Sequence, residues 1–299
     1  MLRHSPRALA PLLALLWLTF STSAFAATQP ALFTMISGKP EMLAQGAQKS
    51  WPIKVREDSA FDAVFQGGMW LPIPSGGRVY VKYQRHIVHA NGNWTWVGTI
   101  STVHGNQSVV LTFGKDGVFG LIPQTSGYPL RIVTSQGETR VVETSAEAMA
   151  RSAQALRLRS RQDYVIPPRI TPKNGQNQLM MQAAADAAVQ QAAASSGPVT
   201  IDVMVAYTPG FVSMLGSQSL ALTHIQNLVD ITNQAYLASG VNQQIRLVHT
   251  VEVNYPDKTS NESALDDITG SDGTNPVPIP ASCKTLPTCA CSTAPTWWQ

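Results

Sequence analysis

Residues 199–209, VTIDVMVAYTP, form a nearly continuous apolar run that is closed by a proline. A strand that is apolar on both faces is usually central in a sheet that helices cover. Residues 219–240, SLALTHIQNLVDITNQAYLASG, follow with apolar side chains at helical spacing. They predict a helix with Ser217 or Ser219 as its N-cap and Gly240 as its C-cap.

Residues 243–256, QQIRLVHTVEVNYP, alternate apolar and polar side chains up to Pro256. This alternation predicts a second strand that is covered on one face only. Strand, helix and strand in this order predict a right-handed βαβ unit with parallel strands. We therefore expect an incomplete α/β unit over residues 198–270.

The sequence before this unit has a β pattern from Trp51 to about Val142. Residues 77–102, GRVYVKYQRHIVHANGNWTWVGTIST, alternate on both sides of an Asn-Gly pair, which is a strong hairpin signal. Further turn signals follow at KDG and SQGE. The spacing predicts an antiparallel meander or a small barrel, so the fold class is α+β overall.

The first 26 residues have the pattern of a secretory signal peptide. Two arginines precede the apolar stretch 8–20, and small residues at Ala24 and Ala26 form an A-x-A-like cleavage site. The apolar stretch is shorter than the roughly 20 residues that span a bilayer. We expect a secreted protein, extracellular or periplasmic, with no membrane contact after cleavage of the signal.

These patterns divide the chain into five segments. Residues 1–26 are the expected signal peptide and 27–145 a β-rich domain. Residues 146–197 are a helical, Pro- and Ala-rich linker whose composition suits proteolytic cutting. The βαβ unit occupies 198–270, and we expect residues 271–299 to be a disordered tail.

Charge is distributed unevenly along the chain. Residues 1–197 hold 18 Lys and Arg against 10 Asp and Glu, a balance of +8, whereas residues 198–299 hold 3 against 8, a balance of −5. The two parts are therefore expected to attract each other. Nucleic acid is not an expected partner, because the basic residues are dispersed and the chain is exported.

The histidines do not form a metal-binding pattern. His86 and His89 are three residues apart on a predicted strand, so they face opposite sides and cannot chelate one ion together. His104 is interpreted as a turn residue. His224 borders the apolar stripe of the predicted helix and His249 the apolar face of the last strand, so both are interpreted as structural.

All three cysteines lie in the last stretch, CKTLPTCACSTAPTWWQ, at residues 283–299. They have no partner at zinc spacing, and a disulfide would leave one of the three unpaired. If one nucleotide was lost just before Cys283, the original reading frame is shifted by one base. With permitted third-position bases, the tail in that restored frame can be translated as LQNLANLRVLYGADLVA, which has a helix pattern followed by a short apolar strand. We therefore interpret the tail as frameshifted.

The segments VTIDVMVAYTPGF and ALTHIQNLVDITNQAYLASGVNQQIRLVHTVEVNY resemble the start of the catalytic domain of reprolysin-like zinc metalloendopeptidases, which are metzincins. They are most similar to the secreted bacterial group that includes peptidyl-Asp metalloendopeptidases. The resemblance covers residues 198–270 directly and the tail only in the restored frame. It implies that residues 27–145 are the propeptide of a zymogen, in contact with the catalytic domain of the same chain.

The resemblance also implies a zinc mechanism for the full-length family, with protein or peptide substrates. Three histidines of H-E-x-x-H-x-x-G-x-x-H hold the zinc, and the Glu takes a proton from the attacking water. None of the six histidines here precedes a Glu, and no two are four residues apart. We therefore assign no catalytic, cofactor-binding or metal residue, and expect a precursor truncated before the motif, inactive and without bound zinc.

Two other classes of function stay open. The β-rich domain could be a non-catalytic exported binding or interaction module, with the βαβ unit as a partner surface. A surface adhesin is a third class, but the sequence contains no repeats or anchor that would support it.

Overall fold

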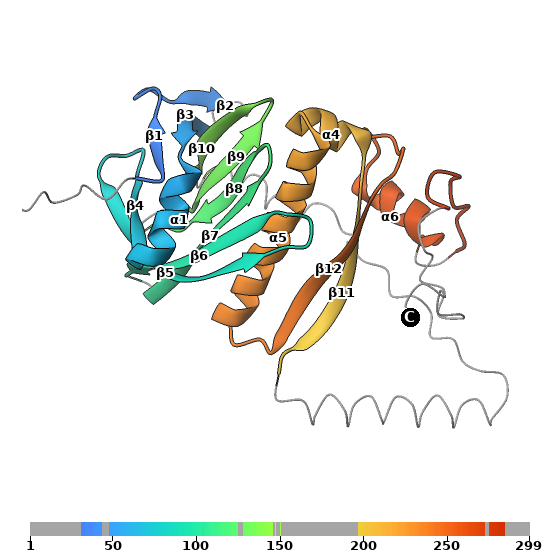
Figure 1. Ribbon diagram of the computed structural model, residues 1–299. Coiled ribbons are helices and arrows are strands. Elements are labelled where there is room, and N and C mark those ends of the chain that lie inside the picture. Colours follow the sequence, from blue (N-terminus) through green and yellow to red (C-terminus); the bar gives the residue numbers. More distant parts are fainter. Residues whose placement is uncertain are drawn as a thin grey trace, which may run out of the picture.

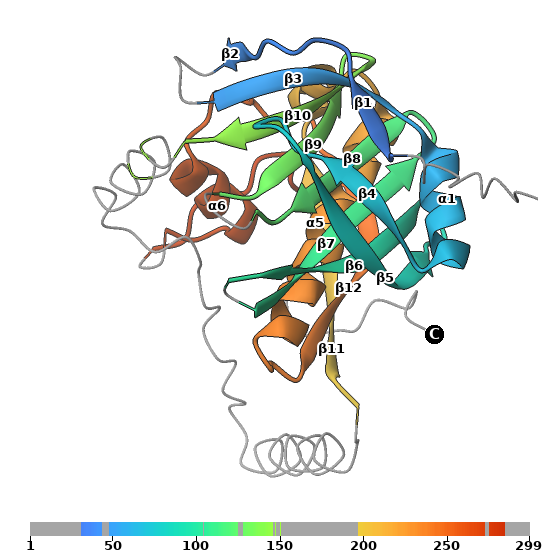
Figure 2. The ribbon, with the colours of Figure 1, turned by 90° about the vertical axis from the view of Figure 1, so that its left-hand side faces the viewer.

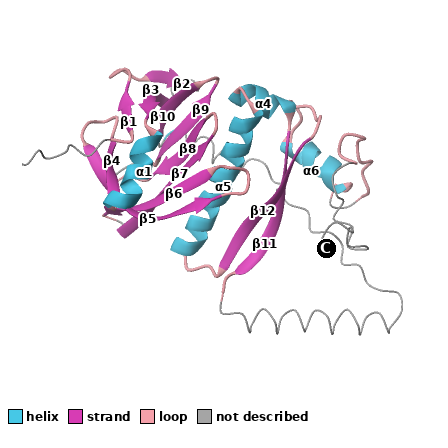
Figure 3. Cartoon of the chain, in the orientation of Figure 1, coloured by secondary structure: helices cyan, strands magenta, loops and turns pink. Residues whose placement is uncertain are grey.

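The computed structural model describes residues 31–43, 48–103, 105–124, 128–145, 147, 150, 197–272 and 275–284. Two β-sheets lie on opposite sides of one long helix, α5 (Figure 1; Figure 3 colours the same view by element type). The elements are β1 Phe33–Met35, β2 Glu41–Leu43, β3 Gln48–Val55, α1 Glu57–Gln66, β4 Gly68–Pro72, β5 Arg78–Val88, β6 Trp94–Thr102, β7 Gly105–Gly114, β8 Gly117–Ile122, β9 Leu130–Ser135, β10 Glu138–Thr144, β11 Val199–Tyr207, α4 Pro209–Leu215, α5 Gln218–Ala238, β12 Gln243–Glu252 and α6 Asn261–Thr269.

The first sheet, called here the N-terminal sheet, contains β1 to β10. Its strands follow the order β1-β3-β10-β9-β8-β7-β6-β5-β4, β2 pairs with β3, and every pairing is antiparallel. Leu32 N, just before β1, donates a hydrogen bond to Trp70 O in β4, so the two ends of the sheet meet (Figure 2). The predicted antiparallel meander is therefore confirmed, in a strongly curled form.

The β5–β6 hairpin closes where the Asn-Gly pair predicts a turn. Gly92 N donates to His89 O, and His89 N donates to Asn93 O. Gly92 has a φ of 84°, in the left-handed region that glycine enters without a steric penalty. The turn brings His89 and Asn93 to the edge of the sheet that faces α5.

The N-terminal sheet encloses a hydrophobic core of its own. Trp96, Phe33 and Leu111 are fully buried in it, and every member of this cluster comes from residues 32–141. Burial of large apolar side chains is the main stabilising contribution in such a core. The sheet therefore does not need the C-terminal residues to complete its interior.

Helix α1 interrupts the stretch that the sequence analysis assigned to strands. Its sequence, EDSAFDAVFQ, contains a single β-branched residue and buries Ala60 and Ala63 against the sheet. Glu57 and Asp58 occupy the first turn, where negative charge interacts favourably with the helix dipole, and Gly67 ends the helix in the left-handed conformation. The continuous β assignment from Trp51 to Val142 was wrong here, because local helix signals outweighed the surrounding period-two pattern.

The second sheet has two strands, β11 and β12, which pair in parallel with a register shift between Val203 and Met204. The short helix α4 and the long helix α5 connect them, so the predicted parallel βαβ arrangement is confirmed. Ser217 is the N-cap of α5, because its hydroxyl accepts a hydrogen bond from Leu220 N. Ser239 is the C-cap, and Gly240 follows it with a φ of 68°.

We call residues 197–272 and 275–284 the C-terminal unit. Its last described residues fold back on it, and Cys283 is buried against Val253. Among the described residues, no helix has both the length and the apolarity to cross a membrane. Residues 1–30, 151–196 and 285–299 lie outside the described residues, so the expected signal peptide, most of the linker and the expected shift of frame in the tail stay predictions.

Candidate functional site

The described residues bring chemically active side chains together where α5 meets the N-terminal sheet. Asp230, in the middle of α5, is 4% exposed and accepts three hydrogen bonds through its carboxylate. His89 Nε2 lies 3.0 Å from Asp230 Oδ2, and the hydroxyl of Thr95 donates to the same oxygen at 2.5 Å. Gln226 Nε2 donates to the other oxygen at 3.3 Å, so the buried charge is fully surrounded by donors.

One turn earlier on α5, Asn227 continues this network into the sheet. Its Nδ2 donates to Thr112 Oγ1 at 3.0 Å and to the carbonyl oxygen of Phe119 at 3.3 Å. Thr112 Oγ1 in turn lies 2.9 Å from Thr95 Oγ1. Thr95 and Thr112 are fully buried, so the network links β6, β7 and β8 to α5 without exposed members at its centre. We call Asp230, Asn227, His89, Thr95 and Thr112 the polar cluster.

A glycine allows the helix to approach the sheet closely. Thr223 on α5 is fully buried against Gly114 at the end of β7. A Cβ at Gly114 would collide with Thr223 Oγ1 and lie 2.9 Å from Asn93 Oδ1. The absence of a side chain at Gly114 therefore determines how closely α5 can approach β7.

The contact becomes apolar toward the N-terminal end of α5. Phe119 of β8 packs there with Leu215, Leu220 and Ala221, which are also buried. The ring of His224 lies 4.7 Å from the Phe119 ring, in an edge-on arrangement. Burial lowers the pKa of His224 below its ordinary value of 6.5, and the positive charge of Arg131 acts in the same direction.

The carbonyl end of α4 is bound by the turn between β9 and β10. Gln136 N donates to Leu215 O at 2.8 Å, and its side-chain amide donates to Ser213 O. The Ser135 hydroxyl donates to Met214 O at 2.7 Å. These donors satisfy carbonyl groups that a helix terminus leaves without intrahelical partners.

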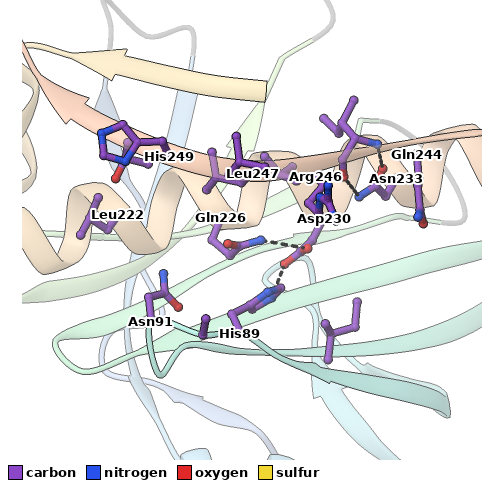
Figure 4. A pocket seen from close by; sticks show the side chains of 16 residues that line it. His89, Asn91, Leu222, Gln226, Asp230, Asn233, Gln244, Arg246, Leu247 and His249 are labelled. Carbon is purple, nitrogen blue, oxygen red and sulfur yellow. Dashed lines mark hydrogen bonds and ion pairs between the residues drawn. The ribbon is translucent and has the colours of Figure 1, made fainter. Parts of the chain in front are cut away.

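Beside the polar cluster lies an open cleft of about 510 Å³. Figure 4 shows that α5, β12 and the β5–β6 turn each contribute side chains to it, with His89 and Asp230 pointing toward each other. His249 lines the cleft from β12, and Asn233 is held by two hydrogen bonds to the backbone of Ile245. The cleft combines polar groups from both parts of the chain.

His86 and His89 have separate hydrogen-bond partners. His86 is hydrogen-bonded to the Tyr83 hydroxyl at 2.7 Å, whereas His89 follows β5 and pairs with Asp230. His104 lies outside the described residues. Within the described ranges, no group of three or more His, Cys, Asp and Glu side chains is arranged to hold a metal ion.

The sequence analysis missed the partnership of His89 with α5. The signal that could have revealed it is a second stripe on the predicted helix, since Thr223, Asn227, Asp230 and Gln234 recur at a spacing of three or four residues. All four are buried, so the helix is covered on a polar face as well as on its apolar face. A polar stripe at helical spacing is ordinarily interpreted as a solvent-exposed helix face. Only the tertiary structure shows that the N-terminal sheet packs over this stripe.

Comparisons with known proteins show that part of the C-terminal unit is similar to peptidase sequences. Residues 197–278 match the sequence model of metallo-peptidase family M12B, reprolysin-like. A peptidyl-Asp metalloendopeptidase of Pseudomonas aeruginosa is 35% identical over 65 residues, which are 22% of this chain and 11% of that relative. The chain thus spans about a ninth of this relative's length. No solved structure matches this chain.

Proposed function

We propose that this chain is the precursor portion of a secreted zinc-dependent metalloendopeptidase. In this proposal residues 1–26 are the signal peptide, 27–145 the propeptide, 146–197 the linker and 198–270 the start of the catalytic domain. Residues 271–299 are the tail, of which residues 283–299 are read in a shifted frame. The observation that carries the proposal is the match of residues 197–278 to the reprolysin-like model, because these residues form the βαβ unit that the sequence predicted.

The N-terminal sheet supports the propeptide role by its position. It has its own core, lies outside the matched residues and covers one face of α5. It contains no cysteine, so a thiolate cannot hold it to a catalytic zinc. Inhibition by this domain therefore acts through packing and hydrogen bonds.

The residues present do not fit a zinc site. Zinc in proteins is held by three or four His, Cys, Asp or Glu ligands, and the part of the chain that the structure describes offers no such group. No histidine precedes a Glu anywhere in the sequence. The chain as printed is therefore proposed to be inactive, although its family hydrolyses proteins or peptides.

Peptidase activity and metal content test this proposal. We expect the purified protein to hydrolyse neither azocasein nor gelatin above a mock preparation, and to contain much less than one zinc per chain by mass spectrometry. Chelator-sensitive hydrolysis would contradict the proposed inactivity. Sequencing the gene across the codons for residues 281–299 and a few hundred bases beyond should reveal the His motif in another frame; an intact gene without it would remove the peptidase assignment.

A non-catalytic binding module is the second candidate, and an exposed apolar cleft on the N-terminal sheet favours it. Phe61 and Phe65 of α1, with Val88 and Trp94 of the β5–β6 hairpin, line a cleft of about 360 Å³. Phe65 is 89% exposed and Val88 74% exposed. Large apolar side chains gathered in the open are typical of an interaction site.

Binding of the apolar dye anilinonaphthalene sulfonate measures the availability of this cleft. We expect dye fluorescence with the native protein to fall at least about twofold in Phe65→Ser, because the substitution removes the most exposed apolar wall. Val103→Ser is the matched control, since Val103 is 81% exposed but lies outside the cleft. Equal losses in the two variants would count against a binding role for the cleft.

A further inference from the structure

We propose that the contact between α5 and the N-terminal sheet is a separable docking interface. In this view the two parts of the chain remain paired without a covalent connection, and Gly114 and the polar cluster determine the pairing. The inference concerns association alone and does not depend on peptidase activity.

The N-terminal sheet and the C-terminal unit each have a cluster of buried apolar side chains that contains no buried residue of the other. The core of the N-terminal sheet consists only of residues 32–141. The C-terminal unit has a smaller cluster of its own around Val253. A single shared apolar cluster, Phe119 with Leu215, Leu220 and Ala221, spans the contact. Separation would therefore leave the larger core intact.

The middle of the contact is polar, which is the composition of an interface that opens. Asn227 and Asp230 on α5 are hydrogen-bonded to Thr112, Thr95 and His89 on the sheet. Thr223 on α5 lies against Gly114 and Asn93. A permanently buried surface is typically apolar at its centre, whereas separable interfaces retain polar groups that water can solvate when the partners part. The five side chains of the polar cluster are hydrogen-bonded in the docked state, so docking leaves none of them without a partner.

The charge of the two parts favours their association. Residues 27–145 hold 10 Lys and Arg against 7 Asp and Glu, a balance of +3, whereas residues 198–299 have a balance of −5. His89 with Asp230 forms an ion pair across the contact when the imidazole is protonated. Opposite net charges accelerate encounter and orient the partners, while the buried hydrogen bonds determine the register.

Gly114 offers a substitution that acts most strongly on the contact, because a Cβ there collides with Thr223 Oγ1 of α5 and lies 2.9 Å from Asn93 Oδ1 in the β5–β6 turn. A Cβ at this position meets Thr223 and Asn93, and no left-handed φ prevents an L-residue from adopting the native backbone. Gly114→Ala should therefore push α5 away from β7. Gly38→Ala is the matched control, because nothing lies within 4 Å of a Cβ there.

The test uses the full chain with the recognition sequence of a specific viral protease inserted between residues 171 and 177. After the cut, we expect the two fragments to co-elute in size-exclusion chromatography at micromolar concentration. Gly114→Ala should raise their dissociation constant about tenfold or more, as expected for overpacking at a tight contact, and Gly38→Ala should leave it within twofold. The double variant Gly114→Ala with Thr223→Ala should recover part of the affinity, because it removes the colliding hydroxyl.

A second pair of variants tests the polar cluster. Asp230→Ala should weaken the cut pair about tenfold or more, because hydrogen bonds to a buried charge are lost. Asp267→Ala is its control, since Asp267 accepts a hydrogen bond from the Tyr255 hydroxyl inside the C-terminal unit and does not line the cleft beside the polar cluster. Circular dichroism of the uncut variants verifies that the strands still form.

Two outcomes would overturn the inference. One is that the cut wild-type fragments separate at micromolar concentration. The other is that neither Gly114→Ala nor Asp230→Ala changes the affinity by more than twofold while the uncut chains stay folded. Because association is the readout, a negative result here leaves the proposed peptidase family untouched, and a negative peptidase assay leaves this inference untouched.

Discussion

Two histidines illustrate how surroundings decide the role of a residue type. His89 and His224 are both near the contact with α5, but His89 faces a carboxylate and His224 faces the aromatic rings of Phe119 and Phe211. His224 Nδ1 is buried, and it has no hydrogen-bond partner among the described residues. The neutral form of His224 is therefore favoured in the folded protein.

The lowered pKa of His224 predicts a stability that decreases in acid. In the unfolded chain His224 takes up a proton near pH 6.5, whereas in the folded chain it does so only at lower pH. Its contribution is present above pH 6.5 and is lost as the pH falls below that value. We expect the thermal midpoint to fall between pH 7.5 and 5.5, and to fall less in His224→Gln.

Proton NMR of the imidazole gives the direct measurement. The C2 proton of His224 should titrate below pH 6.5, and Arg131→Gln should move this titration upward, because the positive charge that disfavours protonation is gone. A His224 titration at or above pH 6.5 in the wild-type protein would contradict the structure.

At the scale of elements, α5 packs against both sheets. Its N-terminal cap and its polar stripe therefore affect the packing of the whole chain. The N-cap Ser217 accepts a hydrogen bond from Leu220 N and donates one to Asp116 of the N-terminal sheet. Ser217 therefore caps the N-terminus of α5 and also bonds to the N-terminal sheet that packs on this helix. The helix boundary was predictable from the sequence, but the contact with Asp116 was not.

Removing this cap should destabilise the C-terminal unit. Ser217→Ala is expected to lower the free energy of unfolding by about 1 kcal/mol, as for other N-cap serines. Urea unfolding followed by circular dichroism measures this change. Ser213→Ala is the matched control: Ser213 is an exposed residue of α4, and we expect a change within about 0.5 kcal/mol. Similar losses in both variants would show that the cap hydrogen bond does not matter.

At the scale of the whole molecule, the chain consists of a curled antiparallel sheet and a parallel βαβ unit with one helix between them (Figure 1). The two strands of the unit keep apolar side chains in the open, including Val199 and Ile201 at 42% and 41% exposure. Strands of this composition are usually covered on both faces, but within the part of the chain that the structure describes β11 is exposed or half-buried at every residue before Tyr207.

The sequence by itself determined the local structure of this protein. The Asn-Gly turn of the β5–β6 hairpin, the apolar run of β11, the period of α5 and the alternation of β12 depend on neighbouring residues, so their patterns were sufficient to predict them. Helix α1 was missed because a ten-residue helix inside a β region gives too short a pattern. The absence of an H-E-x-x-H motif was likewise visible in the sequence.

Only the tertiary structure decided which surfaces meet. Thr223, Asn227 and Asp230 have the pattern of a solvated helix face, and their burial against β6 and β7 depends on residues more than a hundred positions away in the chain. Hydrogen bonds between such distant polar groups leave no periodic signature, because their strength depends on distance and desolvation in the folded state.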